Sequence, residues 1–167
     1  MEIRKSKIED LDRIMDIYNF ARKFMAEHGN PNQWGARNWP PIDLIKKDIE
    51  EGTSYVCLND KKEVIGTFCY MYGKDIEPTY KVIKKGSWIS DTPYGVVHRI
   101  AGDGSEKGIG AFCINWAYEK CKHIRIDTHG DNKVMQNLVT KLGFKYCGII
   151  NVKEDSYDRL AYEKIET

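Results

Sequence analysis

The chain has 167 residues, which suits one compact domain, because a core of this size buries roughly two thirds of the surface of the unfolded chain. Its 26 basic and 25 acidic residues nearly cancel, which excludes the strong positive charge used to bind nucleic acid or anionic membranes. The chain start lacks the apolar core of a signal peptide, and no apolar run approaches the roughly 20 residues of a membrane span. We therefore expect one domain over residues 1–167 that stays in the cytoplasm and contacts neither nucleic acid nor membrane.

The number and spacing of the cysteines also agree with a cytoplasmic protein. The five cysteines are odd in number, widely spaced and never in the C-x-x-C pattern of zinc or redox sites. We expect them to be reduced, small core residues, and we expect no bound metal. They are Cys57, Cys69, Cys113, Cys121 and Cys147.

The first predicted elements are a short strand around Ile3 and a long helix. Ser6 and Glu9 have the spacing of a capping box, which satisfies the free amides of a helix start. Behind them, apolar residues recur every three or four positions, which predicts an amphipathic helix ending near Gly29. The apolar positions are Ile8, Leu11, Ile14, Met15, Tyr18, Ala21 and Met25.

A loop, a helix and a hairpin are predicted next. Residues 30–41 hold three prolines and two tryptophans without periodicity, so they form a loop. A helix over Ile42–Glu51 stops at Gly52. Ser54–Leu58 and Val64–Tyr72 are rich in β-branched and aromatic residues and predict an antiparallel hairpin.

The second half alternates strands and helices after residues 73–93, to which no element is assigned. Two strands joined by a helix of this length should lie parallel, with the helix packed on one face of the sheet. The expected fold is therefore α/β, a mixed, mostly antiparallel sheet with a central parallel strand pair and helices on both faces. The expected elements are a strand at Tyr94–Ala101, a helix at Gly108–Cys121, a strand at His123–His129, a helix at Asp131–Leu142, and a closing hairpin of Phe144–Val152 with Tyr157–Ile165.

A glycine-containing segment, Ser105–Ala111, lies between a predicted strand and helix. Its glycines, Gly108 and Gly110, permit a tight turn and leave backbone N–H groups uncovered, and these with the helix end form a site for a pyrophosphate. Lys107 adds a positive charge. A dinucleotide fingerprint would require a third glycine where Cys113 stands, so a nucleotide-dependent oxidoreductase is disfavoured. The alternative is that the glycines serve only close packing.

A second motif follows the next strand. Asn132 begins a helix that Gly143 ends before another strand. Both motifs thus come at the carboxyl ends of neighbouring parallel strands, the usual place for a ligand, so one extended cofactor could contact both.

These motifs resemble the GNAT (Gcn5-related) N-acetyltransferase family over essentially the whole chain. The resemblance is carried by Val97–Ala101, the loop Ser105–Ala111 and the segment Asn132–Phe144. It implies the GNAT fold and acetyl-CoA as co-substrate, with the pantetheine arm along the end of the first parallel strand and the pyrophosphate on the loop. Asn132 would bind the pantetheine region, its alternative role being a helix cap. The residues expected to bind acetyl-CoA are Ile100, Ala101, Gly102, Lys107, Gly108, Ile109, Gly110, Ala111 and Asn132.

Other residues are candidates for binding the acceptor. In this family the loop after the first helix helps to shape the acceptor pocket, which suggests Gln33, Trp34 and Trp39, although these indoles could instead pack on the core. Asp127 and His129 share a strand face and could steer an amine or brace the loop to Asn132.

Amine acetylation requires an oxyanion donor, a base and an acid. The backbone N–H near Ile100 is the candidate donor. His98 is the candidate base, since it lies two residues before Ile100 on one strand, although a core histidine is an equal alternative. Many family members use a tyrosine as acid where this chain has Val139, which leaves Tyr157 and Tyr146 as candidates.

The expected function is N-acetyl transfer from acetyl-CoA to a primary amine of a small molecule or peptide. The alternative is an inactive acetyl-CoA-binding regulatory or interaction module, which the residue at Val139 favours. The closing hairpin offers an edge through which a homodimer could form.

Overall fold

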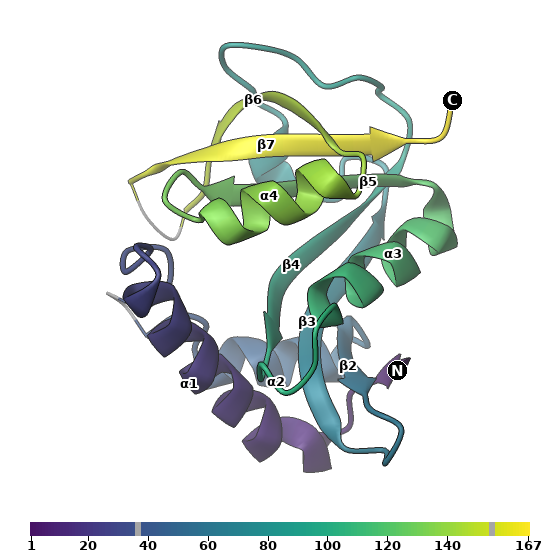
Figure 1. The fold of residues 1–167 in the computed structure, drawn as a ribbon. Coiled ribbons are helices and arrows are strands. Elements are labelled where there is room, and N and C mark those ends of the chain that lie inside the picture. The colour runs from purple at the N-terminus through teal and green to yellow at the C-terminus, as the bar shows by residue number, and fades with distance from the viewer. Residues whose placement is uncertain (36–37, 154–155) are drawn as a thin grey trace. The chain divides into compact units, whose positions relative to one another are not determined.

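A computed structural model describes residues 1–35, 38–153 and 156–167, so that positions 36 and 37 of the predicted loop lie outside the described residues (Figure 1). The described residues divide into two compact units. The first unit is Met1–Tyr70 with His98–Trp116, and the second unit is Met71–Val97 with Ala117–Thr167. The prediction of one domain over residues 1–167 stays a prediction.

The strands form one mixed sheet of seven, in the order β1-β2-β3-β4-β5-β7-β6. The pairs β1 with β2, β2 with β3, β5 with β7 and β6 with β7 are antiparallel, whereas β4 and β5 are parallel, with Gly95 opposite Ile124. The predicted mixed sheet with a central parallel pair is therefore confirmed. The strands are β1 (Glu2–Lys5), β2 (Ser54–Leu58), β3 (Val64–Gly73), β4 (Tyr94–Gly102), β5 (His123–His129), β6 (Lys145–Asn151) and β7 (Asp158–Ile165).

The core of the first unit is formed by the apolar side of α1 (Leu11–Glu27) against α2 (Ile42–Glu50) and β2. Val56 and Leu58 of β2 belong to this core, whereas Cys57 between them meets the thiol of Cys113 on α3 (Ile109–Cys121). Alternate residues of a strand point to opposite faces, so β2 has α1 and α2 on one face and α3 on the other. The buried residues of this core are Leu11, Ile14, Ile17, Tyr18, Ala21, Trp34, Ile45, Val56, Leu58 and Ala101.

The start of the first helix differs from the prediction. Ser6 does not cap a helix, because its hydroxyl is buried and lies 2.8 Å from the Ser54 hydroxyl. The chain instead forms a short 3-10 turn, η1 (Ile8–Asp10), and the carboxylate of Asp10 accepts the Lys7 N–H at 2.7 Å. Hydrogen bonding from Arg4 lowers the pKa of Asp10, which keeps this acceptor charged. Asp10, rather than the predicted Glu9, therefore supplies the carboxylate that accepts a free N–H at the start of this turn.

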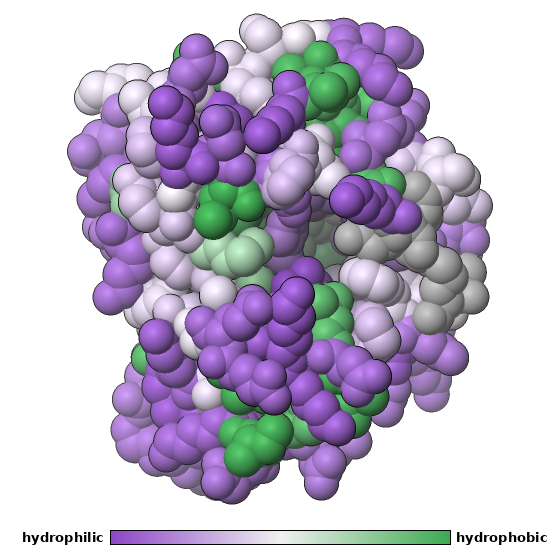
Figure 2. All heavy atoms as spheres, turned by 180° about the vertical axis from the view of Figure 1, so that it is seen from behind, coloured by the Kyte–Doolittle hydropathy of each residue, from purple (hydrophilic) through white to green (hydrophobic). Residues whose placement is uncertain are grey.

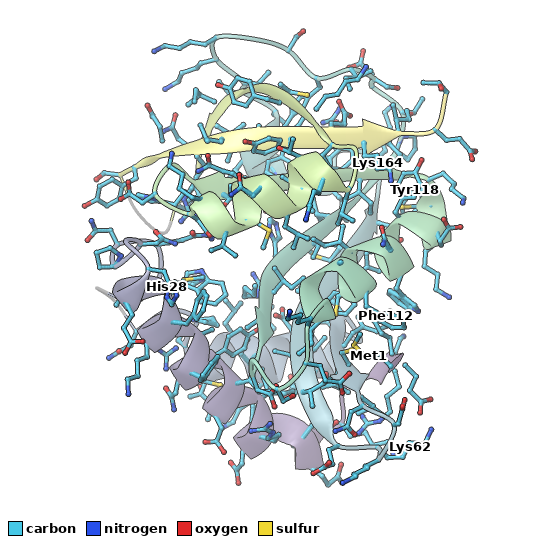
Figure 3. The ribbon with its side chains drawn as sticks, in the orientation of Figure 1. Met1, His28, Lys62, Phe112, Tyr118 and Lys164 are labelled. Atoms are coloured by element: carbon cyan, nitrogen blue, oxygen red, sulfur yellow. The ribbon has the colours of Figure 1, made fainter. Side chains whose placement is uncertain are left out.

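The second unit has its own apolar core, formed by Tyr80, Tyr94, Val96, Ile150 and Ala161. The segment without a predicted element contributes to it through the 3-10 helix η3 (Pro78–Tyr80), and Lys84 forms an isolated bridge with Ile149 of β6. At the end of α3 the Lys164 ammonium lies 4.2 Å over the Tyr118 ring, and Figure 3 shows these two side chains beside each other.

A buried charged cluster also lies in the second unit. Glu163 of β7 is fully buried and accepts hydrogen bonds from His123 at 2.5 Å, from Arg125 at 2.9 Å and from the N–H of Ile89 at 2.5 Å. The Arg125 guanidinium is 4.2 Å from the centre of the nearby Trp88 ring. Burial by itself would raise the pKa of Glu163, but the hydrogen bonds from His123, Ile89 and Arg125 outweigh it and lower that pKa.

No helix among the described residues is both long enough and apolar enough to cross a bilayer. Figure 2 shows that hydrophilic side chains cover much of the face seen from behind, with hydrophobic ones in separate small areas.

Candidate functional site

The end of β4 and the loop that follows are anchored by backbone and carboxylate bonds. The N–H of Asp103 donates to the carbonyl of Ile65 on β3 at 2.9 Å. The Asp103 carboxylate accepts the Ser105 N–H at 2.9 Å and pairs with Arg13 of α1 at 2.6 Å. The loop therefore leaves β4 in a fixed direction.

The predicted phosphate loop ends at an exposed helix start. Lys107 and Gly108 are exposed, Gly108 has φ +84°, and a Cβ added there would meet no heavy atom within 4 Å. Ile109 is buried, 3.3 Å from where a Cβ on Gly102 would stand, and anchors the first turn of α3 to β4. The first N–H groups of a helix have no intrahelical partner and carry its positive end, so this start suits an anion. Gly110 and Ala111, also predicted to contact the cofactor, lie in that turn and are partly exposed.

A local kink interrupts β4 just before its end. Arg99 has φ +53°, in the left-handed region that residues with a side chain seldom adopt. Alternation of side chains holds only for regular extended backbone, so the predicted common face of His98 and Ile100 does not follow from their spacing. Both side chains are partly exposed.

The side chain of Arg99 is held by an ion pair that the sequence motifs do not reveal. Its Nε and Nη2 donate to one carboxylate oxygen of Asp48 at 3.0 and 2.8 Å, and both side chains are largely buried. Burial raises the pKa of Asp48, and the charges of Arg99 and His98 oppose the rise, which places His98 within electrostatic reach of this carboxylate.

The direction of the Ile100 N–H follows from the peptide that joins it to Arg99. This peptide is trans, so the N–H of Ile100 points away from the Arg99 carbonyl, which accepts the Tyr18 hydroxyl at 2.7 Å. The role of this N–H as an oxyanion donor stays a prediction.

The predicted acceptor residues of the first unit lie in or beside its core. The Trp34 indole is buried and packs edge-on against Tyr18, with ring centres 5.7 Å apart. Gln33 is buried and accepts a hydrogen bond from the Asn30 amide at 3.0 Å. Trp39 is partly buried against the same core. These contacts support the core alternative for Trp34, and the predicted contacts of all three residues with an acceptor stay predictions.

In the second unit, Asp127 and His129 both brace their surroundings. Asp127 accepts the Tyr80 hydroxyl at 2.6 Å and pairs with Arg159 at 3.4 Å. His129 is buried, and its Nδ1 accepts the N–H of Asp131 at 3.0 Å. The Tyr157 ring lies 4.9 Å from the His129 ring. The bond from His129 to Asp131 braces the loop to Asn132, as the alternative for that residue states, whereas Tyr80 and Arg159, which contact Asp127, lie outside this loop. The predicted roles of these residues in substrate binding and catalysis stay predictions.

Asn132 caps α4 (Lys133–Lys141). Its side-chain oxygen accepts the N–H of Met135 at 3.0 Å, which satisfies one free amide of the helix start. Val139, where many family members have a tyrosine, is fully buried. The cap is thus observed, and the contact between Asn132 and a cofactor stays a prediction.

Two substitutions separate these roles of Asn132. Asn132→Ala should lower the free energy of unfolding by about 1 kcal/mol, because the cap acceptor is lost, whereas Asn132→Asp should keep it. If the side-chain amide also binds acetyl-CoA, Asn132→Asp should weaken that binding at unchanged stability. Urea denaturation and calorimetry measure the two effects, and an Asn132→Asp protein with normal affinity would leave the residue only its cap.

Among the described residues, no three His, Cys, Asp or Glu side chains gather as metal ligands would.

Comparison with solved structures gives close matches along nearly the whole chain. An acetyltransferase of the GNAT family from Streptococcus agalactiae is 30% identical, with a TM-score of 0.88 over 99% of this chain and 95% of the other. A putative acetyltransferase from Staphylococcus aureus is 23% identical, with a TM-score of 0.69 over 99% of each chain. A GNAT acetyltransferase from Listeria monocytogenes is 18% identical, with a TM-score of 0.66 over 98% of this chain and 93% of the other. No protein-family model and no curated protein matches the sequence.

Proposed function

Because the chain belongs to the GNAT family of acetyltransferases, we propose that it transfers the acetyl group of acetyl-CoA to a primary amine. Acyl transfer is the activity of the family, and the identity of donor and acceptor is the proposal. The observation that carries it is the exposed, glycine-lined start of α3 directly after β4. The proposed acceptor is an amine of a small molecule or a peptide.

The residues at the start of α3 fit the diphosphate of acetyl-CoA. Free N–H groups of the first turn can donate to phosphate oxygens, and the open space at Gly108 admits them close to the backbone. The exposed Lys107 ammonium adds a positive charge beside this turn. Gly102, next to the same turn, ends the strand along which the pantetheine arm is proposed to lie.

The proposed chemistry uses the kinked end of β4. The N–H of Ile100 would donate to the thioester oxygen as it becomes an oxyanion, and His98 would take a proton from the attacking amine. The leaving thiolate needs a proton as well. Val139 is buried and has no acidic group, so that proton would come from water or from another side chain such as Tyr157.

One observation favours a second function, a binding module without catalysis. The buried Val139 removes the proton donor that many family members have at this position. Such a module would bind acetyl-CoA but release no coenzyme A in the presence of any amine.

The binding site is tested by Gly108→Asn. Asparagine tolerates left-handed backbone, so the fold should remain, but its side chain would occupy the space at the helix start. We expect the Kd for acetyl-CoA, measured by calorimetry, to rise at least about tenfold, or about 1.4 kcal/mol.

Gly29→Asn is the matched control, because Gly29 has φ +82° and equally open surroundings at the end of α1. It should bind acetyl-CoA normally. A folded Gly108→Asn protein with unchanged Kd would show that acetyl-CoA does not use this helix start.

A further inference from the structure

Tyr18 of α1 contacts the backbone of β4 at its kink. The Tyr18 hydroxyl donates to the carbonyl of Arg99 at 2.7 Å, across 81 positions of sequence. The ring is buried and is held edge-on by Trp34. Burial raises the pKa of Tyr18 far above its usual value, so the hydroxyl keeps its proton and remains a donor.

The same peptide unit carries the proposed oxyanion donor. The Arg99–Ile100 peptide is trans, so its C=O and its N–H point in opposite directions from one rigid plane. Tyr18 holds the carbonyl end of that plane, and the N–H of Ile100 is its other end. A hydrogen bond to the carbonyl also polarises the amide, which makes the N–H a stronger donor.

The side chain of Arg99 fixes the kink from a second direction. Left-handed backbone in a residue with a side chain is unfavourable and persists only where surrounding contacts hold it. The ion pair of Arg99 with Asp48, largely buried, and the Tyr18 hydroxyl are such contacts. Two separate elements, α1 and α2, thus hold one residue of β4.

We infer that Tyr18 is a positioning residue for acetyl transfer: its hydroxyl, together with the Asp48–Arg99 ion pair, aims and strengthens the N–H of Ile100 toward the thioester carbonyl. The inference rests on the proposed function. It assigns Tyr18 and Asp48 to the reaction without contact to the acetyl group.

Tyr18→Phe tests the inference, since it removes the hydroxyl and keeps the buried ring. Acetyl-CoA labelled with ¹³C at the thioester carbonyl is bound to the protein, and the carbonyl band is read by isotope-edited infrared spectroscopy. In the parent protein the thioester carbonyl band should lie at a lower frequency than that of acetyl-CoA in a water-free solvent, because the carbonyl oxygen accepts the N–H of Ile100. In Tyr18→Phe the carbonyl band should return toward its frequency in free acetyl-CoA, and the Kd should stay within about twofold. The kcat should fall about tenfold, which is less than the roughly hundredfold to thousandfold loss that follows removal of a whole oxyanion donor.

The matched control is Ser54→Ala, which also loses a buried hydroxyl hydrogen bond in the first unit but lies on β2. It should change neither the band nor kcat, so that a general loss of stability is separated from positioning. Should Tyr18→Phe fail to fold, Asp48→Asn decides instead, because it weakens the other hold on Arg99 and should move the band in the same direction.

An unchanged band and unchanged kcat in the folded variant would overturn the inference and leave the proposed function intact. A parent protein that binds no acetyl-CoA would overturn both.

Discussion

Replacing His98 with alanine is expected to lower kcat for acetyl transfer by about a hundredfold to ten-thousandfold, the usual contribution of a general base. His98 is partly exposed on β4, two residues before Ile100, whose N–H is the proposed oxyanion donor. The affinity for acetyl-CoA should stay within about twofold, because the residue acts on the amine.

The pH dependence of kcat separates catalysis from packing. An imidazole base gives kcat a rising limb between about pH 5 and 8, and this limb should be absent from His98→Ala. His28→Ala is the control, since His28 is exposed and stacks on Phe24 at the end of α1. If His98→Ala retains near-normal kcat with the same limb, another residue or water is the base, and His98 is a structural side chain.

A second large effect is expected from Glu163→Ala, which should lower the free energy of unfolding by about 3–5 kcal/mol. The substitution leaves Arg125 buried without its carboxylate and removes the acceptor for His123 and for the Ile89 N–H. A buried charge that loses its partner keeps its full desolvation cost. Urea denaturation monitored by tryptophan fluorescence measures the loss.

The cluster also predicts how stability depends on pH. The pKa of Glu163 is lower in the folded protein than its ordinary value of 4.5. The stability that ionised Glu163 adds to the fold is therefore complete above pH 4.5 and is lost as the pH falls through the folded pKa. Glu51→Gln, which removes an exposed partner of Lys47, should change stability by less than about 0.5 kcal/mol. A Glu163→Ala protein as stable as the parent would contradict the assigned role of the cluster.

Local patterns predicted most of the secondary structure. The helix over α2 and the strands β2 and β5 were predicted within one residue of their bounds, because apolar periodicity and glycine stops act within a few residues. The crossover from β4 through α3 to β5 predicted the parallel pair. The capping box was wrong by one position, since Ser6 bonds to Ser54, which is 48 residues away.

The candidate site was predicted only where it depends on local sequence. The glycines that predict the loop at Gly108 are neighbours in the sequence, and in the structure this loop ends at an exposed helix start. The left-handed Arg99 has no such signal, because a position that takes this backbone is normally glycine or asparagine. The Tyr18 and Asp48 contacts with Arg99 join residues that are 81 and 51 positions apart, and no spacing in the sequence indicates them.

Acetyl transfer itself is tested most directly by incubating the protein with acetyl-CoA and a library of amines while free thiol is measured. Mass spectrometry identifies the acetylated amine, and the same reaction with acetyl-CoA but without amine is the control. We predict thiol release that requires both the protein and a particular amine, with one acetylated product per thiol. Binding of acetyl-CoA without release in the presence of any amine would contradict the proposed enzyme and identify a binding module instead.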